Sequence, residues 1–323
     1  MAWRPQFCAN LLAWYDAHAR DLPWRRTQDP YRIWLSEIML QQTRVAAVIE
    51  HYHEFLRRFP TVQKLAAARE ASVLAAWSGL GYYRRARMMH KAARMIARKR
   101  GGKFPSVSDE LRNLPGIGRY TAAAIASIAF DEPVAVVDGN VERVLQRISG
   151  TWLSKESLWK TAGGLIDSSR PGDFNQAMME LGAVICTPRA PACLTCPVID
   201  FCATRGRLDG SAKTPVQKKR EVHYALMEKQ TRESGKEVFL TQRPANAPLM
   251  GGMWELPSAN EERKGDALLK LKHSITVTNY TVHVWRAMAA TGQPGKWFGA
   301  GRLKALPLTG LARKILRKSG FLS

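Results

Sequence analysis

Four cysteines lie within a short stretch of the chain, and their spacing constrains the fold more than any other feature. Cys186, Cys193, Cys196 and Cys202 are separated by six, two and five residues. Four thiolates can hold a [4Fe-4S] cluster or a tetrahedral zinc ion, because both prefer soft sulfur ligands. Zinc usually takes its ligands as two close pairs, and only Cys193 and Cys196 form such a pair here. The pattern therefore favours the cluster.

Disulfide bonds are the alternative use of these cysteines. They would require an oxidising compartment, whereas the chain begins Met-Ala-Trp-Arg-Pro and shows no apolar signal region. We therefore expect a reducing compartment and no secretion signal. The fifth cysteine, Cys8, has no cysteine near it in the sequence and is interpreted as a packing residue.

The chain is strongly basic. It carries 49 Lys and Arg against 27 Asp and Glu, which gives a formal net charge of +22. Such an excess indicates a polyanionic partner, and the apolar runs are far shorter than the ~20 residues that a membrane span needs. Nucleic acid is favoured over lipid, because each phosphate neutralised by Lys or Arg releases counterions. A basic protein without such a partner remains the alternative.

The length of 323 residues predicts at least two domains. Apolar residues recur at helical spacing over 1–202, which predicts an all-α domain. Basic residues among Gly, Ser, Thr and Pro dominate 203–221, which we interpret as a linker. Short strand-like runs follow at 222–227, 238–241 and 275–284, with a basic helix near 311–317. Residues 222–323 are therefore predicted to form a smaller α+β domain.

Gly116 and Gly118 form a turn between two helical stretches. Glycine allows a tight turn and a close approach of the backbone to a ligand, and exposed amides at a helix N-terminus attract phosphate. A Pro-Gly-x-Gly turn alone is more often a plain helix connection. Together with the cysteines and the positive charge, this turn indicates a helix-hairpin-helix motif that binds DNA.

Two carboxylates are candidates for catalysis. Asp138 directly precedes a helical pattern, where a structural N-cap is the ordinary interpretation, but a helix N-terminus also stabilises an ionised carboxylate. A lone helical glutamate is usually solvated, yet Glu37 is flanked by Leu35 and Ile38, so burial should raise its pKa. A protonated Glu and an ionised Asp form the pair that cleaves a glycosidic bond through an oxocarbenium-like transition state.

Several further runs match the pattern of one enzyme family. They are residues 22–24, 34–43, 79–83, 101–105, 137–141 and 174–183. With the hairpin and the cysteines, these runs make the chain resemble the MutY-type adenine DNA glycosylases of the helix-hairpin-helix, iron-sulfur superfamily. The resemblance implies a six-helix barrel over about 29–133 and a cluster subdomain from 1–28 and 134–202, with DNA crossing between them. It also implies removal of flipped-out adenine from double-stranded DNA in which adenine is mispaired with 8-oxoguanine or guanine.

The resemblance assigns roles to individual residues. Glu37 would protonate N7 of adenine, and Asp138 would stabilise the cationic sugar, by a transient covalent bond that water then opens. Tyr120 and Asn140 match family residues that assist these carboxylates. The residues matching the adenine pocket are Trp24, Arg25, Leu40, Gln176 and Met179. Those matching duplex contacts are Gln42, Thr43, Leu80, Tyr82, Gly116 and Gly118. For pocket and wedge residues, ordinary core packing remains the alternative.

Tyr120 separates the chain from bifunctional endonuclease III-type enzymes. These carry a lysine just after the hairpin, whose amine forms a Schiff base and breaks the strand. We therefore expect base removal without an efficient lyase step. An endonuclease III-like glycosylase and lyase, a non-catalytic DNA-binding iron-sulfur protein, and a redox protein that uses the cluster for electron transfer remain the alternatives.

The second domain resembles the family's Nudix-like domain at residues 241–244 and 251–257 and at Trp297. No glutamate-rich helix follows residue 257, so the domain should bind and not hydrolyse. Where the family reads 8-oxoguanine with a Phe-Ser-His loop, this chain has Thr276 to supply a hydroxyl but Val277 in place of the histidine. The expected preference for 8-oxoguanine is weakened accordingly. We expect a monomer in the cytoplasm, associated with the nucleoid if the source is bacterial, without a membrane partner.

Overall fold

The computed structural model describes residues 2–208, 218–231, 235–247, 250–259, 266–275, 278–288 and 294–322. The chain divides into two compact units. Unit 1 comprises Met1–His53, Thr61–Ala66 and Lys91–Ala212, and unit 2 comprises Glu54–Pro60, Ala67–His90 and Lys213–Ser323. Unit 2 therefore combines the C-terminal part of the chain with helical segments that come much earlier in the sequence.

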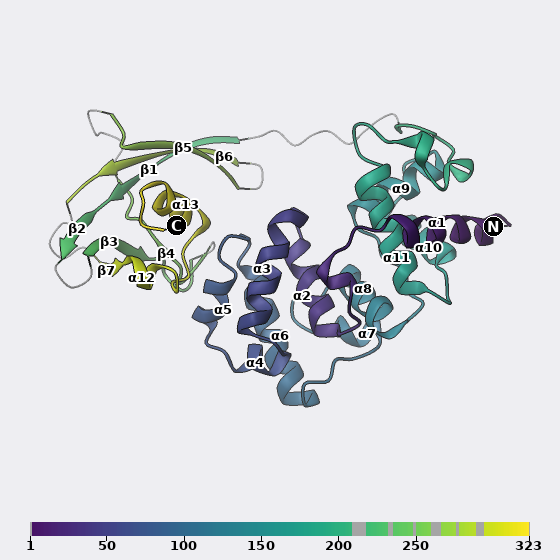
Figure 1. Cartoon of the computed structure of the whole chain (residues 1–323), viewed down its shortest axis with the longest axis horizontal. Helices are drawn as coiled ribbons and strands as arrows, with labels where there is room; N and C mark the ends of the chain where they lie inside the picture. The colour runs from purple at the N-terminus through teal and green to yellow at the C-terminus, as the bar shows by residue number, and fades with distance from the viewer. Residues whose placement is uncertain are drawn as a thin grey trace. The chain divides into compact units, whose positions relative to one another are not determined.

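The first two thirds of the chain are helical, as the apolar spacing predicts (Figure 1). The α-helices are α1 (Arg4–His18), α2 (Pro30–Leu40), α3 (Val45–Arg58), α4 (Val62–Ala67), α5 (Glu70–Ala76), α6 (Arg84–Arg100), α7 (Ser108–Leu111), α8 (Arg119–Phe130), α9 (Gly139–Ser149), α10 (Lys155–Leu165) and α11 (Pro171–Glu180). The shorter elements are the 3-10 helices η1 (Pro23–Arg25), η3 (Cys193–Thr195) and η4 (Ile199–Phe201), and the π-helix η2 (Leu181–Ile185). None of the described helices is both long and apolar enough to cross a membrane.

The core of unit 1 joins helices from both ends of the helical region. Helix α11 packs against α1, α8 and α9, and α2 packs against α8. Val144 and Leu145 of α9 are buried in this core beside Phe174 of α11, as their helical spacing predicts. Burial of these apolar side chains is the main source of stability, at roughly 25 cal/mol per Å² of apolar surface removed from water.

Helix α11 approaches α8 so closely that one position has no room for a side chain. A Cβ atom on Gly172 would lie 2.7 Å from the carbonyl oxygen of Ser127 and 2.9 Å from Cα of Ile128. Because both neighbours are backbone atoms, they cannot move aside without shifting the helix. Glycine at this position therefore sets the distance between the two helices.

One turn further along α11, Asn175 holds the segment that leads to Asp138. Its side chain is 2% exposed, accepts a hydrogen bond from the amide of Val136 at 3.0 Å and donates to the carbonyl of Val134 at 2.8 Å. A further bond at 2.9 Å joins it to the Ser127 hydroxyl of α8. The extended backbone before α9 is thereby fixed by a buried side chain.

The C-terminal part of the chain is α+β, which confirms the predicted fold class. Its strands are β1 (Lys218–Leu226), β2 (Glu228–Thr231), β3 (Gly235–Gln242), β4 (Trp254–Glu255), β5 (Leu269–Ile275), β6 (Thr278–Arg286) and β7 (Lys296–Gly299). Strand β6 pairs in parallel with β1 and antiparallel with β5, while β3 pairs antiparallel with β2, β4 and β7. Helices α12 (Ala300–Leu303) and α13 (Gly310–Lys318) follow, and Ile315 of α13 is buried with Val282 of β6.

Two expectations for this part differ from the structure in detail. The run 275–284 is not one strand, because it contains the end of β5 and most of β6. Strand β1 begins at Lys218, inside the segment 203–221 that composition predicts as a linker. Lys218 pairs with Thr278 of β6. Backbone pairing with β6 therefore makes this basic segment a strand, although its composition is typical of a linker. Residues 209–217 of the expected linker lie outside the described residues.

Replacing Gly172 by alanine should destabilise the protein, because the added methyl group meets the backbone of α8. We expect a loss of about 1–3 kcal/mol in the free energy of unfolding, measured by chemical denaturation. Gly163→Ala in α10 is the matched control, since a Cβ there meets nothing. That control should be neutral or stabilise by up to about 1 kcal/mol. Equal stability of the two variants would contradict the close approach of α11 to α8.

Candidate active site

Glu37 lies in the last turns of α2, with its side chain turned into the protein. It is 6% exposed, and its neighbours Leu35 and Met39 are fully buried. Burial raises the pKa of Glu37 to about 7, and a hydrogen bond from Tyr120 partly opposes this rise. A carboxyl with this pKa is protonated in a large share of molecules at neutral pH, which suits a general acid.

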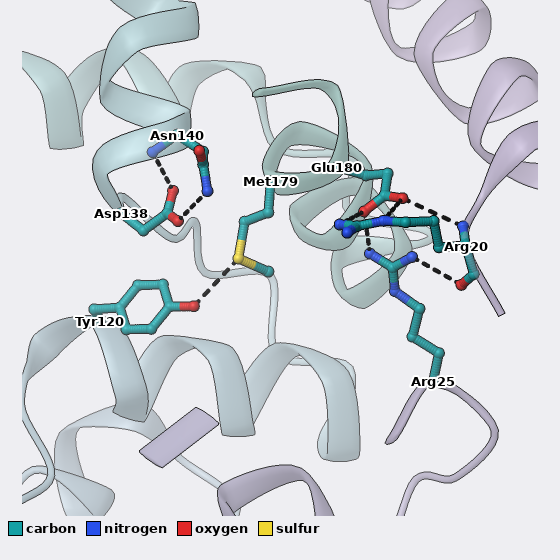
Figure 2. Close-up of polar contacts among 7 residues, drawn as sticks. All are labelled: Arg20, Arg25, Tyr120, Asp138, Asn140, Met179 and Glu180. Atoms are coloured by element: carbon teal, nitrogen blue, oxygen red, sulfur yellow. Dashed lines mark hydrogen bonds and ion pairs between the residues drawn. The ribbon is translucent and has the colours of Figure 1, made fainter. Parts of the chain in front are cut away.

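Tyr120 lies in the first turn of α8, directly after the hairpin. Its hydroxyl donates to Oε2 of Glu37 at 2.6 Å and lies 3.2 Å from Sδ of Met179 (Figure 2 shows the second contact). The hydroxyl has one hydrogen, and an ionised carboxylate accepts it far better than a thioether does. Burial raises the pKa of Tyr120 well above its usual value, so the phenol remains a donor.

Asp138 is the N-cap of α9, as the sequence suggests. Its Oδ1 accepts hydrogen bonds from the amides of Asn140 at 2.9 Å and Val141 at 2.8 Å. Its Oδ2 accepts one from the side-chain amide of Asn140 at 3.0 Å (Figure 2). These donors orient the carboxylate at the N-terminus of α9, where the positive end of the helix dipole lies. The Asp138 side chain is thus both an N-cap and a preorganised acceptor.

The structure brings the two carboxyl groups into one site. The charge of Asp138 raises the pKa of both Glu37 and Tyr120, and Arg25 lowers the pKa of Glu37. Three helices that are far apart in the sequence, α2, α8 and α9, therefore contribute to a single cluster of titratable groups. Glu37 can hold a proton near neutral pH, and the Asp138 carboxylate is held in place by amides of α9. The site thus pairs a proton donor with an oriented carboxylate, as cleavage of a glycosidic bond needs.

Glu180 is a buried carboxylate that the sequence patterns did not single out. It is 1% exposed and accepts from Arg20 at 2.6 and 2.7 Å and from Arg25 at 2.8 Å (Figure 2). Burial alone would raise the pKa of Glu180, but the hydrogen bonds from the two arginines outweigh it and lower the pKa to about 2. Arg25 also donates to the carbonyl of Arg20 at 3.0 Å, so its guanidinium is held from two sides.

Arg143 links Asp138 to the cysteine region, a role that sequence reasoning also missed. It donates to the side-chain oxygen of Asn140 at 2.8 Å, to the carbonyl of Gly182 at 2.6 Å and to the carbonyl of Cys186 at 2.7 Å. Gly182 allows this approach, because a Cβ there would lie 2.6 Å from Cβ of Asn140. Gly182 and Cys186 lie 39 and 43 residues from Arg143 in the sequence, and no local pattern indicates their pairing.

Two of the four predicted metal ligands, Cys186 and Cys202, contact a second arginine. Arg147 donates to Sγ of Cys186 at 3.2 Å, and its carbonyl oxygen lies 3.4 Å from Sγ of Cys202. Burial raises the pKa of Cys196 to about 11, and the thiols of Cys186, Cys193 and Cys202 add to this rise, so all four interact. None of them is in a disulfide.

These observations test whether the cysteines suit a metal centre. Burial and neighbouring cysteines raise the pKa of Cys186 and Cys196. Holding these side chains as thiolates therefore needs a compensating positive charge, which a bound metal centre supplies. The donor set of four soft sulfur ligands fits an iron-sulfur cluster. Among the described residues, no group of three or more His, Cys, Asp or Glu side chains is arranged to hold a single metal ion.

Two predicted pocket residues act on the site: Arg25 on the pKa of Glu37, and Met179 through its contact with Tyr120. The other three lie on η1, α2 and α11, the elements that also carry Arg25, Glu37 and Met179. Trp24 is buried against the ring of Tyr52, with centroids 5.5 Å apart. Leu40 is half-buried at the end of α2, and Gln176 is half-buried on α11, one turn before Glu180.

The predicted duplex contacts differ in their exposure. Gly116 and Gly118 are exposed at the hairpin, and Gly116 has a φ of 79° that favours glycine. Gln42 is exposed after α2, with a φ of 58°, and Thr43 beside it is half-buried. In unit 2, Tyr82 is 43% exposed whereas Leu80 is only 6% exposed, so Leu80 packs as a core residue in this state. Thr276 and Val277 lie outside the described residues.

Comparison with known proteins places the chain in a family. Residues 35–161 match the HhH-GPD superfamily base excision DNA repair protein family. The chain is 39% identical over 80% of its length to the adenine DNA glycosylase of Rattus norvegicus, of which it covers 61%. It spans about three fifths of the length of the curated mammalian relatives that it matches.

Solved structures match about three fifths of the chain. A thermostable thymine-DNA glycosylase superimposes with a TM-score of 0.59 and 31% identity, over 62% of this chain and 96% of that chain. Endonuclease III in a non-covalent complex with DNA superimposes with a TM-score of 0.54 and 25% identity, again over 62% and 96%. The resemblance to the MutY-type adenine DNA glycosylases is confirmed, and the chain belongs to the HhH-GPD superfamily of base excision DNA repair proteins.

Proposed function

We propose that this protein is an adenine DNA glycosylase of base excision repair, which removes adenine mispaired with 8-oxoguanine or guanine. The observation that carries the proposal is the buried Glu37 carboxyl, whose pKa is raised to about 7 by burial and by the charge of Asp138. The identity to adenine DNA glycosylases supports adenine as the base. The basic charge of the chain and the DNA complex of endonuclease III support double-stranded DNA as the partner.

In the proposed reaction, Glu37 is the general acid. Its proton passes to N7 of adenine as the bond between the base and C1′ of the sugar breaks, so the bonding electrons leave with a neutral base. Tyr120 donates to Oε2 of Glu37, which leaves Oε1 to carry this proton. Arg25 and Met179, beside these groups, are proposed to contact the base together with Trp24, Leu40 and Gln176.

Asp138 is proposed to meet the cationic sugar that remains. Its carboxylate stabilises the positive charge at C1′ or bonds to it transiently, and water then adds at C1′ while its proton passes to the Glu37 carboxylate. Asn140 holds Oδ2 and the α9 amides hold Oδ1, so the carboxylate is oriented before substrate arrives.

The site is proposed to lack lyase activity. A lyase step needs an amine that attacks C1′ and forms a Schiff base. Tyr120 occupies the position of the lysine that endonuclease III-type enzymes carry after the hairpin. The charged groups that act on the pKa of Glu37 and Tyr120 are carboxylates and the Arg25 guanidinium. The expected product is therefore an intact strand with an abasic site.

Cys186, Cys193, Cys196 and Cys202 are proposed to hold a [4Fe-4S] cluster. When bound, the cluster would supply iron–thiolate bonds that fix the loop between η2 and η4. Arg143 would then connect that fixed loop to Asn140, and through it to Asp138, while Arg147 would connect the loop to α9. In this proposal the cluster has a structural role, because the loop that it fixes is connected to Asp138 in the active site.

The C-terminal domain is proposed to read the opposing base, with Thr276 as one contact. This part of the proposal rests on the resemblance to the Nudix-like domain. We further propose that the protein acts as a monomer in the cytoplasm.

A panel of duplexes tests the proposal, with adenine opposite 8-oxoguanine, adenine opposite guanine, and thymine glycol opposite adenine, each assayed with and without alkali. We expect free adenine and alkali-labile sites from the first two duplexes alone. Strand breaks without alkali, together with release of thymine glycol, would instead identify an endonuclease III-like enzyme. DNA binding without release of any base would identify a non-catalytic protein.

Glu37→Gln and Asp138→Asn should each lower the single-turnover rate of adenine excision by roughly 100- to 10,000-fold, the usual contribution of general acid–base groups. Binding of mismatched duplex should persist, because both substitutions keep the size of the side chain. Glu50→Gln, at an exposed position of α3, is the matched control and should leave the rate unchanged. Near wild-type excision by either site variant would reject the assignment.

Tyr120→Phe should move the pH dependence of excision. A general acid with a pKa of about 7 gives a rate that falls as pH rises through that value. Tyr120 lowers the pKa of Glu37, so its loss shifts the falling limb to higher pH, by up to about one unit for a bond worth about 1 kcal/mol. Tyr224→Phe in unit 2 should not move it. A shift to lower pH would contradict the proton-donor role.

Replacement of Cys193 or Cys196 by serine should abolish the broad visible absorbance of a bound iron-sulfur cluster. Cys8→Ala is the control and should keep the colour, because Cys8 lies in the core and bonds to the carbonyl of Leu165. Iron and acid-labile sulfide are measured beside the spectrum. Colourless wild-type protein with stoichiometric zinc after anaerobic purification would contradict the cluster assignment.

A further inference from the structure

The loop between α5 and α6 has an unusual backbone. Gly79 and Gly81 have φ values of 113° and 69°, and Tyr82 has a φ of 47°. Positive φ costs a residue with a side chain free energy, so Tyr82 keeps this conformation only if its surroundings hold it. Tyr82 is also the most exposed large apolar side chain of this loop, at 43%. The loop therefore presents an aromatic ring on a backbone that needs support.

Part of the support comes from Trp77, the C-cap of α5, and from Arg85 in α6. Trp77 donates from its indole nitrogen to the carbonyl of Gly81 at 3.1 Å. Arg85 donates to the carbonyls of Leu80 at 3.1 Å and Gly81 at 3.3 Å. The Arg85 guanidinium also lies 5.5 Å from the ring centroids of both Trp77 and Tyr82. The centre of the loop is thus held by hydrogen bonds to the carbonyls of Leu80 and Gly81 and by cation–π contacts of Arg85.

The two ends of the loop are held by the C-terminal part of the same unit. The carbonyl of Leu308 accepts hydrogen bonds from the hydroxyls of Ser78 at 3.1 Å and Tyr83 at 2.9 Å. Arg313 of α13 donates from Nε to the Ser78 hydroxyl at 2.8 Å. Ser78, Tyr83 and Leu308 are all at most 5% exposed, so water does not compete for these bonds.

Leu308 is itself held in a fixed segment. The carbonyl of Pro307 accepts from the amide of Trp254 in β4 at 2.9 Å, and the amide of Thr309 donates back to the Trp254 carbonyl at 3.0 Å. The Thr309 side chain caps α13 by accepting from the amide of Ala312 at 3.2 Å. The Leu308 carbonyl, which accepts hydrogen bonds from Ser78 and Tyr83, therefore lies in a segment fixed between β4 and α13.

A further contact reaches the first turn of α6. Arg87 donates to the carbonyl of Gly251, in the segment before β4, and pairs with Glu70 of α5 at 3.0 Å. Contacts from Leu308 and Arg313 thus reach the loop at residues 78–83, and Gly251 contacts the helix that follows it. Such a set of buried hydrogen bonds joins two rigid elements and fixes the segment between them.

We infer that Ser78, Tyr83 and Arg313 are positioning residues, through which the C-terminal domain holds the Tyr82 loop in the conformation that enters the DNA duplex. The inference rests on the proposed function, in which Tyr82 contacts the duplex. It assigns the C-terminal domain a second task besides reading the opposing base. A side chain that separates stacked bases must keep its position against the stacking forces of the duplex. The hydrogen bonds from Ser78 and Tyr83 to Leu308 hold the loop in place at both of its ends.

If these residues position the loop, the effect of replacing them should depend on the substrate. Holding the wedge matters when the target adenine must be unpaired and unstacked, and matters little when it is already unpaired. Loss of the anchors should therefore slow excision from a duplex with adenine opposite guanine, and spare excision of adenine opposite an abasic-site analogue. Residues that act only on folding or on the chemical step would affect both substrates alike.

The test uses the full chain with Ser78→Ala and Tyr83→Phe combined, with Arg313→Met as a separate variant. Two lost hydrogen bonds should slow single-turnover excision opposite guanine by roughly tenfold, and excision opposite the abasic-site analogue by less than about twofold. Ser72→Ala, on the exposed surface of α5, is the matched control and should match wild type on both substrates. Melting temperature and visible absorbance check that each variant is folded.

A second readout separates this inference from the proposed function. The fluorescent base 2-aminopurine, placed next to the target adenine, brightens when the wedge unstacks it, whether or not excision follows. We expect wild type and Ser72→Ala to give this signal and the anchor variants to lose most of it. An equal slowing on both substrates, or an unchanged signal in folded anchor variants, would overturn the positioning role. Absence of excision by wild type with the signal intact would overturn the proposed function alone.

Discussion

The burial of the Glu37 carboxyl beside Asp138 is the constraint on which the site depends. Placing an acid among apolar side chains costs free energy when it ionises, and the nearby anion adds to that cost. The protein limits the cost with one hydrogen bond from Tyr120, which leaves the carboxyl able to take up a proton near neutral pH. Helices α2, α8 and α9 must pack as they do to bring these three groups together.

Asp138 has a different environment from Glu37, because hydrogen-bond donors contact both of its carboxylate oxygens. Its oxygens are occupied by amides of α9 and by Asn140, and Asn140 is held by Arg143, whose other bonds go to Gly182 and Cys186. One carboxylate is therefore oriented by the segment that also carries the proposed cluster ligands. The cysteine region and Asp138 are therefore joined by a short chain of hydrogen bonds through Arg143 and Asn140.

Sequence reasoning succeeded where a local pattern reflects a local cause. Helical spacing predicts the buried face of α9, and the position before that helix predicts the cap at Asp138. It failed where partners are distant: Glu180 pairs with arginines 155 and 160 residues away, and such pairing leaves no periodic trace. Leu80 illustrates a second limit, because an apolar side chain can pack or protrude, and only its neighbours decide.

The most direct measurement is the protonation state of Glu37 in the folded protein. Infrared difference spectra between wild type and Glu37→Gln isolate the carbonyl stretch of this one carboxylic acid as pH is varied. The band should be present at pH 5 and disappear with a midpoint near 7, because the buried carboxyl has a pKa of about 7. Full ionisation of Glu37 already at pH 5 would contradict its assignment as the proton donor and, with it, the central claim about this site.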